Sequence, residues 1–140
     1  MTVLHIVRRT AASTAAVNTA VACDLPIDST ASTPITAPGG VITELAVDVV
    51  GAGAEAASTG VVFSVRLSGA GMADGPQDFS TGFIYIGATS TAFQIGGNQT
   101  RIKMDPPLAL KTNLPLTIQV FFNGVDVGSP MAQVELVIQV

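Results

Sequence analysis

Apolar and polar residues alternate along much of this chain, and such alternation is typical of half-buried β-strands. In the clearest segment, residues 41–50, we expect every second side chain to face the core, which gives the inward set Val41, Thr43, Leu45, Val47 and Val49. The next segment, residues 60–68, follows the same rule and gives the inward set Val61, Phe63, Val65 and Leu67. The remaining positions of both segments are mostly polar or small, so each predicted strand has one wet face and one buried face.

Further strands are predicted over residues 79–86, 91–95, 101–104, 116–122 and 132–140. The segment 101–104 runs into Asp105-Pro106-Pro107, and because proline donates no backbone hydrogen bond, this strand must end there or lie at a sheet edge. Turn residues recur about every ten positions, which predicts an all-β fold. We expect an antiparallel two-sheet sandwich of immunoglobulin or jelly-roll type, and favour the jelly-roll-like form, with an extended N-terminal arm and long loops.

The chain is 140 residues long, which suits one domain with one core. Within this single domain, 1–140, we expect residues 41–140 to supply the main strands and residues 1–40 to form an arm and a connector-rich region. Residues 10–23 are rich in Ala and Thr, and we favour a strand there over a weak helical turn. Residues 29–40 are small and include two prolines, so we expect them to add little to the core and to lie extended on a neighbouring surface.

Ionic residues are scarce, since Asp, Glu, Lys and Arg make up 11% of the chain, against roughly 25% in an ordinary soluble domain. A folded monomer of this size exposes about 6,800 Å², or roughly 400 Å² for each ionic group, about the area of the largest apolar patch on a typical soluble monomer. We therefore expect other protein to cover much of the surface; the alternative is a surface wetted by neutral hydroxyl and amide groups. The net charge of -4 argues against a nucleic-acid partner, which calls for a basic face.

The first residues do not read as a secretory signal, because the apolar run Val3-Leu4-His5-Ile6-Val7 precedes Arg8 and Arg9 instead of following them. No apolar stretch reaches the ~20 residues that a membrane-spanning helix needs. We therefore expect a protein that is made in the cytoplasm without a signal peptide and has no membrane partner. The single cysteine, Cys23, excludes an internal disulfide and is expected to be a small core residue.

No set of residues in the sequence indicates a catalytic site. The only histidine, His5, lies in an apolar run far from Cys23, where a structural or interface role is more common than a nucleophilic pair. The near pairs of carboxylates lie in predicted loops: Asp24 with Asp28, and Asp74 with Asp78. Only the second pair is a conceivable calcium site, and whether it binds a cation stays open. We expect no enzyme activity, no cofactor and no small-molecule substrate.

The strands rich in Ala, Thr, Gly and Val, the small-residue connector 29–40 and the missing catalytic set resemble the small cement, or decoration, proteins of tailed bacteriophage capsids. Several of those proteins are single jelly-roll or related β-sandwich domains of this size. The resemblance implies a non-enzymatic structural role in the virion. Homodimers or homotrimers would bind the outside of the capsid and bridge subunits of the major capsid protein, which stabilises the shell against internal DNA pressure.

If the resemblance holds, the interface comes from the arm 2–9 and the connector 29–40, with the candidate residues Val3, His5, Arg8, Arg9, Pro34, Ile35 and Pro38. Arg8 and Arg9 are expected to pair with acidic residues of the capsid and to guide docking. The alternative is a β-sandwich subunit of a tail fibre, pilus or adhesin that acts as a binding module, although a missing signal and few aromatic residues count against it. A cupin-like metalloenzyme is a weaker alternative, because that fold normally supplies a cluster of histidines.

Overall fold

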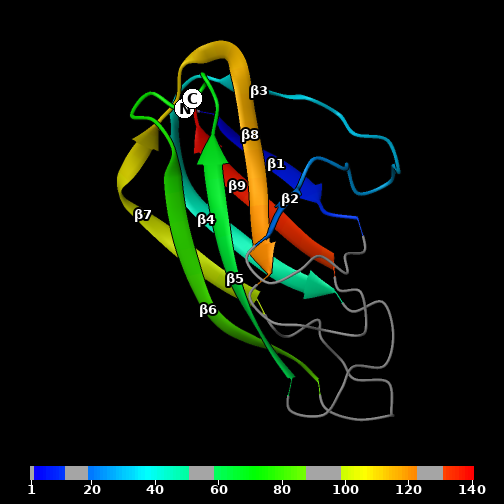
Figure 1. Cartoon of the computed structure of the whole chain (residues 1–140). Coiled ribbons are helices and arrows are strands. Elements are labelled where there is room, and N and C mark those ends of the chain that lie inside the picture. Colours follow the sequence, from blue (N-terminus) through cyan, green and yellow to red (C-terminus); the bar gives the residue numbers. More distant parts are fainter. Residues whose placement is uncertain (1, 12–18, 51–58, 88–98, 123–130) are drawn as a thin grey trace.

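The computed structural model describes residues 2–11, 19–50, 59–87, 99–122 and 131–140 (Figure 1). This part of the chain contains nine strands: β1 (Val3–Arg9), β2 (Thr19–Ala22), β3 (Ile35–Pro38), β4 (Val41–Val50), β5 (Thr59–Ser68), β6 (Gln77–Gly87), β7 (Gln99–Ala109), β8 (Thr112–Phe122) and β9 (Met131–Gln139). None of the described residues is helical, so the predicted all-β fold is confirmed. It follows that no helix among them is long and apolar enough to cross a membrane.

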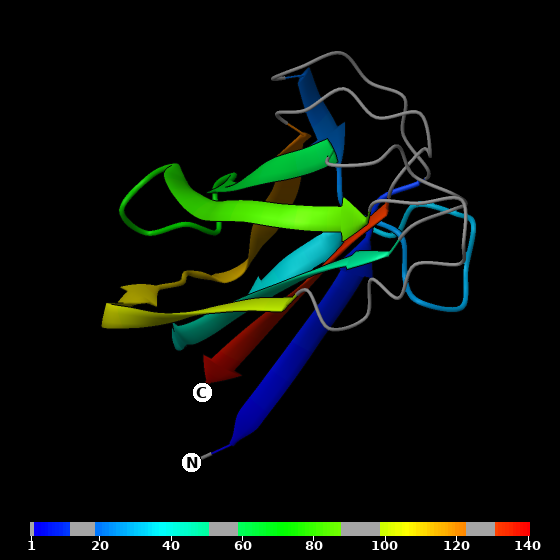
Figure 2. The ribbon, with the colours of Figure 1, turned by 90° about the horizontal axis from the view of Figure 1, so that it is seen from below.

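The strands form two antiparallel sheets that pack face to face (Figure 2). The first sheet has the order β1-β9-β4-β7, and the second has the order β2-β8-β5-β6, with β3 pairing to the other end of β8. The pairs are nested along the chain, because β1 pairs with β9, β2 and β3 with β8, β4 with β7, and β5 with β6. Such nesting, a long hairpin rolled into a sandwich, is the expected jelly-roll topology.

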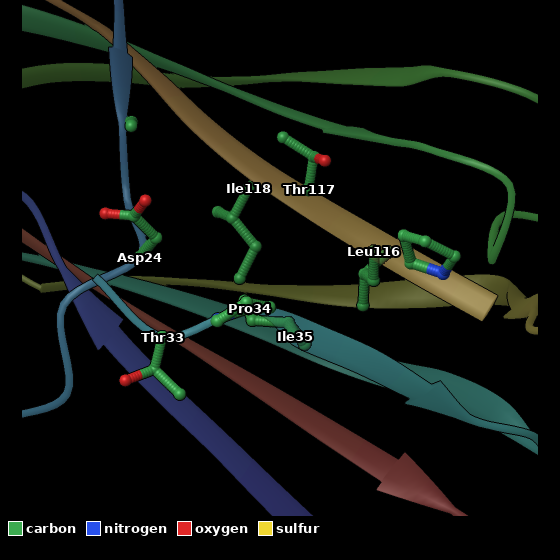
Figure 3. Close-up of a pocket in the computed structure, with 9 residues that line it drawn as sticks. Asp24, Thr33, Pro34, Ile35, Leu116, Thr117 and Ile118 are labelled. Carbon is green, nitrogen blue, oxygen red and sulfur yellow. The ribbon is translucent and has the colours of Figure 1, made fainter. Parts of the chain in front are cut away.

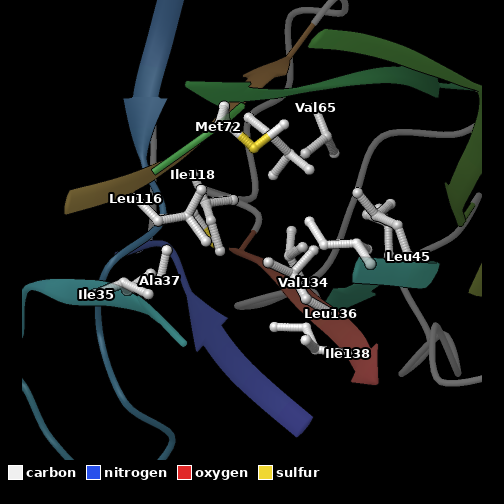
Figure 4. Packing of buried hydrophobic residues seen from close by; sticks show 14 of the residues in the cluster. Ile35, Ala37, Leu45, Val65, Met72, Leu116, Ile118, Val134, Leu136 and Ile138 are labelled. Atoms are coloured by element: carbon white, nitrogen blue, oxygen red, sulfur yellow. The ribbon is translucent and has the colours of Figure 1, made fainter. Parts of the chain in front are cut away.

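The inward side chains of both sheets form one apolar core (Figure 4). Its largest fully buried members are Ile42, Leu45, Leu67, Ile118, Leu136, Ile138, Val47 and Val65. The inward positions expected for Val65 and Leu67 are confirmed, whereas the side chains of Val49, Val61 and Phe63 lie outside the described part of the chain. In β9, buried and half-buried residues alternate without a break, which confirms the predicted last strand.

The predicted faces of β4 are right in its second half and wrong in its first. Leu45 and Val47 are buried as expected, but Ile42 is buried in place of Val41 and Thr43. The register of β4 with both neighbouring strands shifts at Thr43, where a β-bulge inserts one extra residue. Because side chains alternate with a period of two, one extra residue reverses the faces of all residues before it.

β7 runs through the two prolines instead of ending at them, and among the described strands it pairs only with β4. The edge position, one of the two predicted outcomes, is therefore confirmed. The prolines lie within residues 104–107, which have no Cα partner on β4 because the ladder passes directly from Lys103 to Leu108 across the bulge. The missing N–H groups of proline thus fall where the ladder is already interrupted.

The first forty residues contribute more to the fold than expected. Residues 3–9, expected as an extended arm, form β1 and pair with β9 along their whole length. The connector 29–40 contains β3, and the expectation that it adds little to the core is wrong, because Ile35 and Ala37 are buried. Alternate residues of β3 turn inward when this strand joins the edge of the second sheet.

Two further predicted strands have different outcomes. The strand favoured within residues 10–23 is confirmed over β2, while residues 12–18 of that segment lie outside the described part. The strand predicted over residues 91–95 also lies outside the described residues.

Two glycines with positive φ illustrate different constraints on turns. Gly40, with φ of +72°, precedes β4, and a Cβ atom there would clash with the carbonyl oxygen of Gln139 in β9. Gly75, with φ of +82°, precedes β6, and a Cβ atom there would meet no atom within 4 Å. A substitution at Gly75 therefore measures the free-energy cost of a left-handed backbone alone. A substitution at Gly40 adds the cost of a clash with β9.

We expect Gly75→Ala to lower the free energy of unfolding by about 1 kcal/mol, because alanine disfavours a positive φ. Gly40→Ala should lower it by about 2–4 kcal/mol, since the clash with β9 adds to the same conformational cost. Urea denaturation followed by circular dichroism measures both values. Equal losses in the two variants would contradict the close approach of Gly40 to β9.

Cys23 is a core residue, as predicted. Its exposed fraction is 0%, and its Sγ atom lies 3.4 Å from the carbonyl oxygen of Arg8. Burial raises the pKa of the Cys23 thiol to about 12. Because the thiolate is the reactive form of cysteine, Cys23 is chemically protected in the folded protein.

At pH 8 we expect the native thiol to react with a disulfide reagent such as dithionitrobenzoate at least about 1,000-fold more slowly than the same protein in guanidinium, because a rise of three pKa units lowers the thiolate fraction by that factor. Absorbance of the released thionitrobenzoate measures both rates, and the denatured sample is the control. Rapid labelling of the native protein would show that Cys23 is accessible.

Candidate interaction surface

Most of the expected interface residues lie on two neighbouring sheet edges, formed by β1 in the first sheet and by β2 and β3 in the second. The two edges are joined where Arg9 and Leu25 form an antiparallel bridge, in which the N–H of each donates to the carbonyl oxygen of the other, at 2.8 Å from Arg9 and 3.1 Å from Leu25. Thr33, just before β3, donates its N–H to the carbonyl oxygen of Asp24 at 3.0 Å. The candidate residues of the arm and of the connector therefore lie close to one another.

The backbone of β1 alternates between groups that face β9 and groups that face outward. The N–H and C=O of Thr2 bond to Val140, and the N–H of Thr10 donates to the carbonyl oxygen of Ala132. The N–H and C=O groups of the even-numbered residues of β1 therefore point toward β9. In an antiparallel ladder the residues between such pairs direct their N–H and C=O groups to the opposite side.

The odd-numbered residues of β1 form the outer edge of the first sheet. At the end of the strand, Arg9 bonds to Leu25 as described above. Before that bridge, within the described residues, no other strand lies beside Val3, His5 and Val7. We call the outward backbone groups of these three residues the β1 edge. The same residues are partly exposed, with Val3 at 49% and the His5 side chain at 55%.

Ionic side chains cross the outer face of the first sheet in a polar stripe formed by His5 on β1, Glu135 on β9, Glu44 on β4 and Arg101 on β7. The Nδ1 atom of His5 lies 3.3 Å from Oε2 of Glu135. Arg101 donates from Nη1 to Oε1 of Glu44 at 2.7 Å and from Nη2 to Oε1 of Glu135 at 3.5 Å. Ala46 pairs with both Glu135 and Arg101, and its small side chain leaves room for these two to meet above β4.

The charged groups of the polar stripe stabilise one another through hydrogen-bonded ion pairs. The hydrogen bond to Glu44 is the main cause that raises the pKa of the Arg101 guanidinium above its ordinary value. Ion pairs this exposed contribute little to stability, so the stripe matters more for the charge that it presents. Its second carboxylate, Glu135, also orients the ring of His5 beside the β1 edge.

Arg8 and Arg9, expected to pair with acidic residues of a partner, instead bond to their own chain. Arg9 donates from Nη2 to the carbonyl oxygen of Ser29 at 2.8 Å and places Nη1 4.0 Å from Sδ of Met131. Arg8 donates from Nη1 to the carbonyl oxygen of Val7 at 2.9 Å, while its Nε atom is buried and has no partner among the described residues. Both side chains are half-buried, so neither is a free rim charge.

A cavity of about 170 Å³, which we call the notch, lies between β2 and β3 (Figure 3). It is lined by Ala22, Asp24, Thr33, Pro34, Ile35, Pro115, Leu116, Thr117 and Ile118. β2 and β3 pair with different parts of β8 and leave Thr117 and Ile118 between them. Pro34 is exposed, Pro38 is half-buried at the end of β3, and Ile35 is only 6% exposed, so Ile35 offers little side chain to a partner.

Asp74 and Asp78, the carboxylate pair considered for calcium, have different surroundings. Asp78 accepts from Nε of Arg66 at 2.7 Å and from Nη2 at 3.3 Å, and this hydrogen bonding lowers the pKa of Asp78. Arg66 also lies over the ring of Phe121, 4.9 Å from its centroid. Asp78 is thus engaged in an ion pair with Arg66, while Asp74 is exposed in the preceding turn. The described residues contain no group of three or more His, Cys, Asp or Glu that could hold a metal ion.

Comparisons with known proteins identify no family for this chain. No protein-family model matches it, and no curated protein matches it. Among solved structures, a match titled "Crystal Structure of FLHE" covers 97% of this chain and 98% of that chain, with 11% sequence identity and a TM-score of 0.38. A TM-score this low supports no conclusion about a shared fold or function, so the function has to be inferred from the molecule itself.

Proposed function

We propose that this protein is a structural, non-enzymatic part of a phage virion: a cement protein that binds the outside of the capsid and bridges subunits of the major capsid protein. The β1 edge is the observation on which the proposal depends. It offers the outward N–H and C=O groups of Val3 and His5 and the outward N–H of Val7, whose carbonyl oxygen already accepts one hydrogen bond from Arg8. A strand of a neighbouring chain in the protein layer, either a second copy or a capsid subunit, can bond to such an edge directly.

The composition of the surface supports the same role. The molecule exposes 6895 Å² and carries sixteen Asp, Glu, Lys and Arg residues, or about 430 Å² for each. Isolated soluble proteins seldom expose so much area per charge, whereas a protein that lies against several neighbours needs few charges on the covered areas. The partly exposed apolar residues Val3 and Ile27 suit contact with protein.

The mechanism that we propose is additive. Each copy would contact another copy and more than one capsid subunit, and each contact can be weak. On a lattice, the first contact raises the effective concentration for the next, so the assembled layer resists release although a single contact does not. The jelly roll suits this role because its two packed sheets hold the edges and the notch in a fixed relative position.

If the proposal holds, a gene for a major capsid protein lies beside the gene for this chain, and the direct test uses empty shells assembled from the product of that gene. We expect the purified protein to sediment with these shells, to reach saturation at a fixed number of copies per capsid subunit, and to raise the melting temperature of the shell by several degrees. Calorimetry and quantitative gel densitometry measure these effects. A matched control adds an unrelated β-sandwich of similar size and acidity.

Lack of binding to these shells would contradict the proposal. Binding to isolated tail fibres instead would favour the alternative, a binding module of a fibre, pilus or adhesin.

Val3→Asp is a sharper probe, because it adds a charge at an exposed position and leaves the buried core untouched. If β1 forms part of the interface, this variant should fold normally and bind the shell about tenfold more weakly, from desolvation of the new carboxylate.

A further inference from the structure

Among the described edge strands, β1 is the one that contains a segment, residues 3–7, without the usual protection against pairing. Natural edges are usually interrupted by proline, bulges or charged residues. β7 carries two prolines and a register shift, β6 has register shifts along its pairing with β5, and β2 and β3 span only four residues each. β1 pairs with β9 over seven residues without a shift and has no proline. Its charged residues, Arg8 and Arg9, lie at the end of the strand, so the segment 3–7 contains none of these interruptions.

The edge is also self-complementary in sequence. Residues 3–7 read Val-Leu-His-Ile-Val, so the chemical character of this segment is the same in both directions around His5. Two copies of such a segment can pair antiparallel about a two-fold axis, and an interface of this kind places the same patch of both subunits in contact. The pattern therefore favours a second copy of this chain over an unrelated strand.

We propose that two copies of this protein associate through β1, antiparallel and centred on His5, which joins their first sheets into one continuous sheet. In this register Val3 pairs with Val7 of the second copy, and the two His5 residues pair with each other. Each of these residues is one that faces outward on the β1 edge, so every pair exchanges both backbone hydrogen bonds. The inference rests on the proposed structural role for its biological purpose, and on the geometry of β1 for its register.

The neighbouring segments limit the register. The bridge between Arg9 and Leu25 closes the edge beyond Val7, so a partner strand cannot slide past that point. The guanidinium of Arg8 donates to the carbonyl oxygen of Val7, and this oxygen has a second lone pair for the N–H of Val3 of the second copy. The central register is the symmetric one that uses all of Val3, His5 and Val7.

Side chains on both faces agree with this register. On the inner face, Leu4 lies opposite Ile6 of the second copy, and because both residues are only partly buried in one copy, the pairing extends the apolar core across the axis. Arg8 lies opposite Thr2 of the second copy, so no cation faces a cation there. On the outer face, each His5 keeps Glu135 of its own chain beside it, with Arg101 and Glu44 further along the polar stripe.

Disulfide trapping tests the register. In the proposed dimer the Cα atoms of the two residues at position 5 are about 5.5 Å apart, within disulfide range, so His5→Cys should form a covalent dimer under mild oxidation. Val3→Cys is the matched control, because its two copies would lie about 13 Å apart along the strands. The native Cys23 is buried and should not contribute. Non-reducing gels and mass spectrometry measure the product.

Backbone hydrogen bonding is tested by His5→Pro, which removes an outward N–H and leaves the bonds to β9 intact, because even-numbered residues make those bonds. We expect the dimer of this variant to dissociate about 30-fold more readily than the wild type in sedimentation equilibrium. His5→Ala keeps the N–H and should stay within a few-fold of the wild type. Circular dichroism confirms that the variants are folded.

Several results would overturn the inference. They are a wild-type protein that stays monomeric at millimolar concentration, trapping through position 3 instead of position 5, and a dimer that His5→Pro does not weaken. Protection of the Val3 and His5 amides from hydrogen exchange only when shells are added would assign the edge to the capsid instead of a second copy. A monomer that still saturates shells would overturn this inference alone, whereas a trapped dimer that ignores shells would overturn the proposed function alone.

Discussion

Backbone N–H and C=O groups inside a β-sandwich must find hydrogen-bond partners, and in the first sheet β9 is one of the two strands that are paired on both sides. It is the strand that pairs with β1 on one side and with β4 on the other, and its inward residues are buried without exception. The rest of the first sheet follows from this position. β4 can bulge because its ladder with β9 holds on both sides of Thr43, and β7 can carry two prolines because they fall at the gap which that bulge leaves in the ladder with β4. The same demand, left open at the outer side of β1, marks the surface where another chain can bind.

Local alternation of apolar and polar residues was sufficient to predict the strands whose ladders are regular. In β9 and in the described half of β5, no bulge interrupts the period of two, so the inward side chains follow directly from the pattern. In β4 the predicted inward positions before Leu45 were wrong, because an inserted residue shifts the alternation by one position. The types of residue in this segment do not show where the insertion lies. The connector 29–40 was misjudged for a related reason. Small residues and prolines suggested a segment without a core, although the four residues of β3 suffice to bury Ile35 and Ala37.

The candidate surface was predictable only in part. The apolar run around His5 indicated an exposed interface, and its side chains do lie at a sheet edge, but the run is a paired strand instead of a free arm. The polar stripe was not anticipated, since Glu44 and Glu135 are far apart in sequence and meet only through the strand order of the jelly roll. Their outward positions in alternating segments were the one signal available. The bonds of Arg8 and Arg9 within the chain were not predictable, because sequence shows a charge but not the backbone carbonyl that accepts its hydrogen bond. Their pairing with a partner stays a prediction.

The pairing of Thr2 with Val140 has a further consequence. The N–H of Thr2 donates to Val140 at 3.1 Å, and the N–H of Val140 donates to Thr2 at 2.9 Å, so both ends of the described chain lie side by side. A short linker between them would close the polypeptide into a ring without disturbing any strand. New ends could then be opened at Gly75, where the backbone is not crowded by other atoms. Circular permutation would thus move a fused domain from the ends of β1 and β9 in the first sheet to the turn before β6 in the second sheet, while the jelly roll itself is kept.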